Sequence, residues 1–142
     1  MINESVIPLE TIRAYSETEF HVDARPPFTL RVGEYCEHLI SLYKQFRAES
    51  CAYVTACNPR GETISDEENF WLQSELANEL DQRSLKCFDG VGKHPDGDWP
   101  GEQSFLVLGI SLETSKTLGI KLNQNAIIWC SVDAVPQLIL LR

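Results

Sequence analysis

The stretch Cys51–Arg60 decides the fold, and it has the sequence Cys-Ala-Tyr-Val-Thr-Ala-Cys-Asn-Pro-Arg. Its Tyr-Val-Thr centre favours an extended backbone, and the surrounding residues are small or apolar. A short apolar run bounded by a turn signal predicts a strand that is covered on both faces. Pro59 ends the strand, because proline lacks a backbone donor and disfavours helical geometry at the preceding residue. Asn58 and Arg60 therefore lie at the end of a buried strand. They are either ordinary turn residues or side chains that face a cleft.

Alternating and helical patterns on both sides of this stretch predict the other elements. We expect strands at 18–22, 28–32, 85–88, 104–110, 126–132 and 137–141, and helices at 8–15, 35–46, 65–84 and 111–122. The first two strands form an antiparallel hairpin, and the strand–helix–strand order that follows predicts parallel crossovers. One crossover makes the strand at 85–88 parallel to the Cys51 strand. The fold class is therefore α/β (or α+β), a single domain over residues 1–142 with a mixed β-sheet and helices packed on it.

The composition is that of a globular, acidic protein. The 142 residues are 43% hydrophobic and 23% charged, with a formal net charge of -9. Such a charge repels phosphate backbones, so we expect no nucleic-acid partner. The start of the sequence lacks a signal-peptide pattern and no apolar run approaches membrane-spanning length, which predicts a cytoplasmic protein without a membrane partner. Five separate cysteines without a Cys-x-x-Cys pair predict buried free thiols: Cys36, Cys51, Cys57, Cys87 and Cys130.

The segment Asp89–Gly101 is rich in Gly, Pro and Asp, which predicts a long loop. His94, Asp96 and Asp98 are candidate metal ligands, but Pro-Asp-Gly is also an ordinary turn and no further ligand has metal-loop spacing. We therefore predict no metal and no cofactor. Trp99 within this loop is either a lid over a ligand or an anchor to the core.

Strand directions predict where the polar residues meet. If the strand at 104–110 runs opposite to the Cys51 strand, its start lies beside the end of that strand, and the next crossover returns the chain there too. The residues expected at this edge are Asn58, Arg60, Asn69, Trp99, Glu102, Ser104 and Gln124. Glu102 is the candidate catalytic acid or base, and the other six are candidate ligand-binding residues. The alternative is a buried polar network that fixes the loops. Phe70 and Trp71, beside Asn69, are expected to be packing residues.

Several stretches together resemble the uncharacterised bacterial family known as domain of unknown function 3293, over nearly the whole chain. They are 52–60, 65–69, 96–100, 102–109 and 123–126. Two positions depart from the pattern: Cys57 stands where an aromatic residue often precedes Asn-Pro-Arg, and Leu122–Asn125 stands in place of Phe-Gly-Gln-Asn. The resemblance implies a single-domain bacterial protein and brings no activity, substrate or catalytic residue.

The sequence supports hypotheses of different classes. The first is a module that binds a small polar molecule or a protein partner at the polar edge. The second is a small hydrolase or transferase acting on a phosphate- or carboxylate-bearing substrate, with Arg60 on the anion and Glu102 moving protons. A third is a phage-defence or counter-defence protein that uses its acidic surface. Whether the protein is an enzyme stays open at this point.

Overall fold

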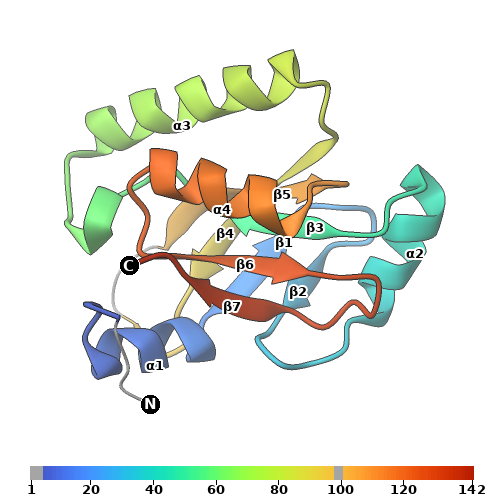
Figure 1. Ribbon diagram of the computed structural model, residues 1–142, viewed down its shortest axis with the longest axis horizontal. Helices are drawn as coiled ribbons and strands as arrows, with labels where there is room; N and C mark the ends of the chain where they lie inside the picture. The colour runs from blue at the N-terminus through green and yellow to red at the C-terminus, as the bar shows by residue number, and fades with distance from the viewer. Residues whose placement is uncertain (1–4, 98–100) are drawn as a thin grey trace.

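A single sheet organises the structure, a computed structural model that describes residues 5–97 and 101–142. The helices are α1 (Leu9–Glu17), α2 (Glu37–Phe46), the 3₁₀ turn η1 (Pro59–Gly61), α3 (Asp66–Gln82) and α4 (Leu112–Lys121). The strands are β1 (Glu19–Val22), β2 (Phe28–Leu30), β3 (Cys51–Val54), β4 (Cys87–Lys93), β5 (Glu102–Leu108), β6 (Ala126–Cys130) and β7 (Gln137–Leu140). They form one seven-stranded sheet in the order β2-β1-β4-β5-β3-β6-β7 (Figure 1).

The middle of the sheet is a split β-α-β arrangement, in which each crossover helix joins two strands that are not neighbours. Helix α3 connects β3 to β4 with β5 between them, and α4 connects β5 to β6 with β3 between them. All six pairs of neighbouring strands in the described residues are consequently antiparallel. The expected mixture of parallel and antiparallel pairs is not found there, because every crossover has a strand of opposite direction inserted into it.

Both faces of the sheet are buried, as the Cys51 stretch predicts. Cys51 and Tyr53 point into a core shared with α2, whereas Ala52 and Val54 point into a second core shared with α3 and α4. Figure 1 shows α3 and α4 together on one side of the sheet. The α/β (or α+β) class with helices packed on the sheet is confirmed.

The strand directions that predict a polar edge are also confirmed. β3 and β5 are antiparallel, with Val54 opposite Phe105, and β3 and β6 are antiparallel, with Tyr53 opposite Ile128. The end of β3 therefore lies beside the starts of both β5 and β6. β4 has the direction of β3, as expected, although β5 separates the two.

The glycine-rich segment after Phe88 begins as a strand, whereas we expected a loop from Asp89 onward. β4 continues to Lys93 and pairs with both β1 and β5. Gly90 is required by a close tertiary contact: the Tyr53 hydroxyl donates to the His21 carbonyl at 2.8 Å, and a Cβ on Gly90 would clash with that carbonyl oxygen and lie 2.6 Å from the hydroxyl. The sequence pattern does not show this contact, and the glycine therefore looks like a loop residue.

We expect Gly90→Ala to lower the free energy of unfolding by about 1–3 kcal/mol, because the methyl group overpacks a closed site. Gly92→Ala is the matched control on the same strand, since its Cβ would meet Phe20 at an ordinary 3.4 Å. Urea unfolding of both variants measures the difference. Equal stability of the two variants would show that the contact at Gly90 is not restrictive.

Candidate functional site

The polar edge begins where β3 leaves the sheet, and side chains of α3 take over its backbone hydrogen bonds. The backbone amide of Ala56 donates to Oε1 of Gln73 at 3.0 Å, and the backbone amide of Asn58 donates to Oδ1 of Asn69 at 2.8 Å. Asn69 and Gln73 are four residues apart and therefore lie on one face of the helix. Two side-chain amides thus replace the strand neighbour that this segment lacks.

On its opposite side, the same segment forms hydrogen bonds with β5 and with the turn before β6. Nε2 of Gln124 donates to the Cys57 carbonyl at 3.0 Å, and the Thr55 hydroxyl donates to the Gln103 carbonyl at 2.6 Å. Gln124 is only 8% exposed. Its amide therefore fixes the turn before β6 against the end of β3, which is a structural contribution.

Asn58 is the centre of the network, and its side-chain amide has a partner at both ends. Its Nδ2 donates to Oε2 of Glu102 at 2.8 Å, while its Oδ1 accepts from Nδ2 of Asn69 at 2.9 Å and from the Ile64 amide at 3.2 Å. Its backbone is left-handed, with φ of 47°. Asparagine tolerates this conformation better than most residues, and these three hydrogen bonds, together with that from its backbone amide to Asn69, hold it there.

Glu102 has a carboxyl group whose pKa is altered by its surroundings at the polar edge. Burial raises the pKa of its carboxyl group above the ordinary value, and the hydrogen bond from Asn58 opposes that rise only in part. No described residue forms an ion pair with this carboxylate or hydrogen-bonds to its Oε1. Glu102 therefore has one committed oxygen and one oxygen that is available to an external group.

Arg60 lies at the outer end of the edge and is exposed. Its backbone is left-handed, with φ of 59°, and its amide donates to the Asn123 carbonyl at 2.6 Å. Within residues 5–97 and 101–142, no hydrogen bond or ion pair engages its guanidinium group. The backbone of Arg60 is thus fixed while its charged end stays available.

The remaining predicted residues divide into a structural one and an undescribed one. Ser104 is 4% exposed, and its hydroxyl donates to the Glu102 carbonyl at 3.1 Å; among the described residues it forms no hydrogen bond with a side-chain base. Cys57 is no better as a nucleophile, since burial, and to a smaller extent the nearby Glu102 charge, raise the pKa of its thiol. Trp99 lies outside the described residues, and its place as a lid or an anchor stays a prediction.

The sequence analysis missed two residues of the edge, Gln73 and Tyr15. Nε2 of Gln73 is buried and has no partner among the described residues, although its Oε1 is committed to Ala56. The helical spacing of Gln73 from Asn69 is a signal that could have identified it. Tyr15 of α1 accepts a hydrogen bond from Nδ2 of Asn125 at 3.0 Å, a long-range contact that no local pattern indicates.

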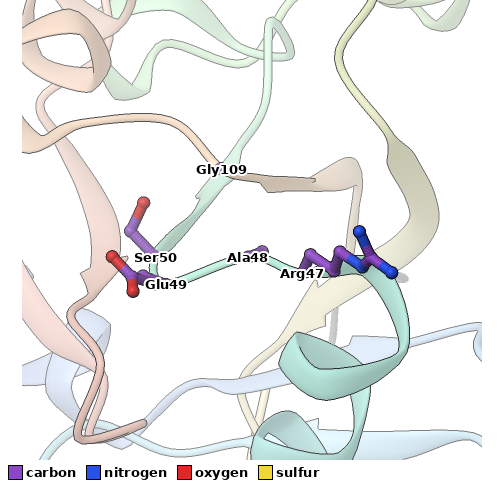
Figure 2. Close-up of a pocket in the computed structure, with 5 residues that line it drawn as sticks. All are labelled: Arg47, Ala48, Glu49, Ser50 and Gly109. Carbon is purple, nitrogen blue, oxygen red and sulfur yellow. The ribbon is translucent and has the colours of Figure 1, made fainter.

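A cavity of about 490 Å³ lies at the other end of β3 and is not this site. It is lined by Arg47, Ala48, Glu49, Ser50 and Gly109 (Figure 2). The side chains of Arg47 and Glu49 point to opposite sides in Figure 2, and the Ser50 hydroxyl donates to the Ile110 carbonyl at 2.7 Å. Because its polar groups diverge or are committed, the polar edge is the better candidate.

A family model described as a protein of unknown function (DUF3293) matches residues 54–127, more than half of the sequence. The chain belongs to the DUF3293 family. The matched region of this DUF3293 protein runs from the end of β3 into β6, so it contains Asn58, Arg60, Asn69, Glu102 and Gln124. Neither the comparison with curated proteins nor that with solved structures found a match.

Three further observations concern chemistry elsewhere in the DUF3293 chain. All five cysteines are free, and four of them are buried. In the described part, no group of three or more His, Cys, Asp or Glu residues is placed to hold a metal ion. No helix of that part combines the length and the apolar character needed to cross a bilayer.

We expect Asn69→Ala to lower the free energy of unfolding by about 1–3 kcal/mol, because it leaves the Asn58 amide without its acceptor in a half-buried position. Asn78→Ala is the matched control, since Asn78 is on the same helix and exposed. Urea unfolding midpoints compare the two. A network that only decorates the surface would give the same small effect in both variants.

The free energy of unfolding of Glu102→Gln should rise relative to that of the unmodified chain as the pH rises. The folded chain holds the Glu102 proton to a higher pH than the unfolded chain does, so stability falls as the pH rises from the unfolded pKa through the raised folded pKa. Glutamine removes this loss and keeps an acceptor for Asn58. Urea unfolding between pH 4 and 8 measures the difference, and a pH-independent difference would contradict the burial of the carboxylate.

Proposed function

We propose that this protein is a binding module for a small polar molecule that bears a carboxylate or phosphate group, with the binding site at the polar edge. The observation that carries this proposal is the uncommitted guanidinium group of Arg60 beside a backbone fixed by Asn123. A guanidinium presents a planar array of donors that matches a carboxylate or phosphate. The amide network holds Asn58, two residues before Arg60.

Two other uncommitted groups support a polar ligand at this edge. Oε1 of Glu102 is available to accept, or to donate when the carboxyl is protonated, and the buried Nε2 of Gln73 has no described partner. An unpaired buried donor costs about 1–3 kcal/mol, so a bound water or ligand group at Gln73 would stabilise the site. The net charge of -9 weakens anion binding only modestly, because charges beyond about 8 Å are screened at physiological ionic strength.

A second candidate, a small hydrolase or transferase for a phosphate- or carboxylate-bearing substrate, is favoured by Glu102 alone. A half-buried carboxyl with a raised pKa and one available oxygen is suited to general acid–base catalysis. In this version Arg60 would bind the anion of the substrate. Glu102→Gln separates the candidates: it abolishes turnover of any substrate in the catalytic version, whereas a binding module loses little affinity.

The binding proposal is tested by a thermal-shift screen with carboxylate- and phosphate-bearing metabolites, followed by calorimetry of each hit. We expect Arg60→Ala to weaken binding of a hit by about tenfold to a hundredfold, because a charge-assisted hydrogen bond contributes about 1.5–3 kcal/mol. Arg60→Lys should recover only part of the loss, since lysine lacks the planar fork.

The matched control is Arg47→Ala, because Arg47 is also exposed and left-handed, with φ of 55°, but lies at the opposite end of β3. It should leave the affinity unchanged. Equal affinity of the Arg60→Ala variant and the unmodified chain for every hit would remove Arg60 from the site and end the proposal.

A further inference from the structure

The outer face of α3 carries an aromatic pair that the core does not use. Phe70 is 76% exposed and Trp71 is 62% exposed, whereas we expected both to pack inside. The helix already fills its core-facing side with Leu76 and Leu80, each 1% exposed, and with the partly buried Leu72. Consecutive residues on a helix are about 100° apart, so the two aromatic side chains lie on the side away from this leucine stripe.

Two adjacent exposed aromatic residues have a different meaning from apolar residues that are scattered singly over a surface. Single exposed apolar side chains are normal on protein surfaces, whereas a contiguous exposed patch marks an interaction site. Large aromatic side chains also dominate interface energetics when a partner covers them. The pair on α3 is therefore apolar surface that folding leaves available.

Carboxylates surround the pair and have no cationic partners in the described part of the chain. Glu67 precedes Phe70 by three residues and Trp71 by four, and Glu75 follows Trp71 by four, so both are neighbours of the aromatics on the helix surface. Asp66 lies one turn before Phe70. We call Asp66, Glu67, Phe70, Trp71 and Glu75 the aromatic face of α3. Within residues 5–97 and 101–142, no ion pair involves its three acids.

The C-terminal half of the same helix shows the contrast. Glu79 forms ion pairs with Lys121 at 2.8 Å and with Arg83 at 2.6 Å, and these partners lower the pKa of its carboxyl group. Of the last two carboxylates of α3, Glu79 is ion-paired and Asp81 is not, and the three beside Phe70 and Trp71 have no such partner among the described residues either. Carboxylates without an ion-pair partner in that part of the chain therefore border the exposed aromatic surface, although they are not confined to it.

We infer that the aromatic face of α3 is a docking site for a basic, apolar segment of a protein partner. Arginine and lysine side chains match this face in two ways. Their charged ends pair with carboxylates or lie over aromatic rings, and their alkyl parts pack on apolar surface. A second copy of this chain is a poor occupant, since symmetric contact would place the same three carboxylates against each other and each copy carries a charge of -9.

The test uses two fluorescein-labelled peptides of twelve residues, one alternating arginine with leucine and the other alternating glutamate with leucine. Fluorescence anisotropy at 150 mM salt should detect binding of the first peptide and not of the second. We expect the double variant Phe70→Ala, Trp71→Ala to bind the basic peptide at least tenfold more weakly. Both residues are exposed, so the variant should fold, which circular dichroism verifies.

Two controls distinguish this site from unspecific attraction to an acidic protein. The double variant Ile120→Ala, Val132→Ala removes apolar residues that are 59% and 62% exposed elsewhere, and it should bind normally. Glu67→Gln, Glu75→Gln should weaken binding severalfold, whereas Glu10→Gln, Glu34→Gln makes the same change in net charge at exposed sites elsewhere and should not.

Three results would overturn the inference. They are an absence of binding to the basic peptide, equal losses in the aromatic variant and its apolar control, and self-association in sedimentation velocity that the aromatic variant abolishes. The last result would assign the face to a second copy of the chain. Because none of these variants changes Arg60 or Glu102, failure here leaves the proposed ligand site at the polar edge untouched.

Discussion

The structure depends on how the end of β3 satisfies its backbone. The ladder between β3 and its neighbours ends at Val54, yet the chain continues beneath α3 to Asn58. Each buried backbone group without a partner would cost about 1–3 kcal/mol. Side-chain amides from α3 and from the turn before β6 supply the missing partners, so they fix where those elements begin. The polar edge is first a solution to a hydrogen-bonding problem, and only its remaining groups are free for function.

Much of this edge could be predicted from the sequence because it follows from direction alone. A buried strand and two crossovers are enough to place Asn58, Asn69 and Glu102 at one edge, and the structure joins them by hydrogen bonds, although β3 ends at Val54 and not at Pro59 as expected. Gln124 arrives there for the same reason. Direction does not determine what these residues do, and most of the amides prove to be committed to the backbone.

The errors arise where tertiary contact decides and local pattern does not. Helical and alternating patterns give the order of elements but not which strand inserts between two others, so the sheet was expected to be mixed. Gly90 looks like a loop residue because the groups that exclude a side chain there, the His21 carbonyl and the Tyr53 hydroxyl, come from segments distant in the sequence. Phe70 and Trp71 were expected to be packing residues because they flank the leucine stripe of α3, yet that stripe already fills the available core.

Some side chains of this protein make no contribution to the fold that the structure shows. Exposed Phe70 and Trp71 forgo roughly 1.5–3 kcal/mol each of burial, and Glu102 is half buried without a cationic partner in the described residues. These features make the isolated chain less stable than it needs to be. The amides of Asn58 and Asn69, in contrast, have their partners within the chain. The exposed aromatic pair and the uncommitted guanidinium group contribute little to the stability of the fold. This is why we propose that both bind partners outside the chain.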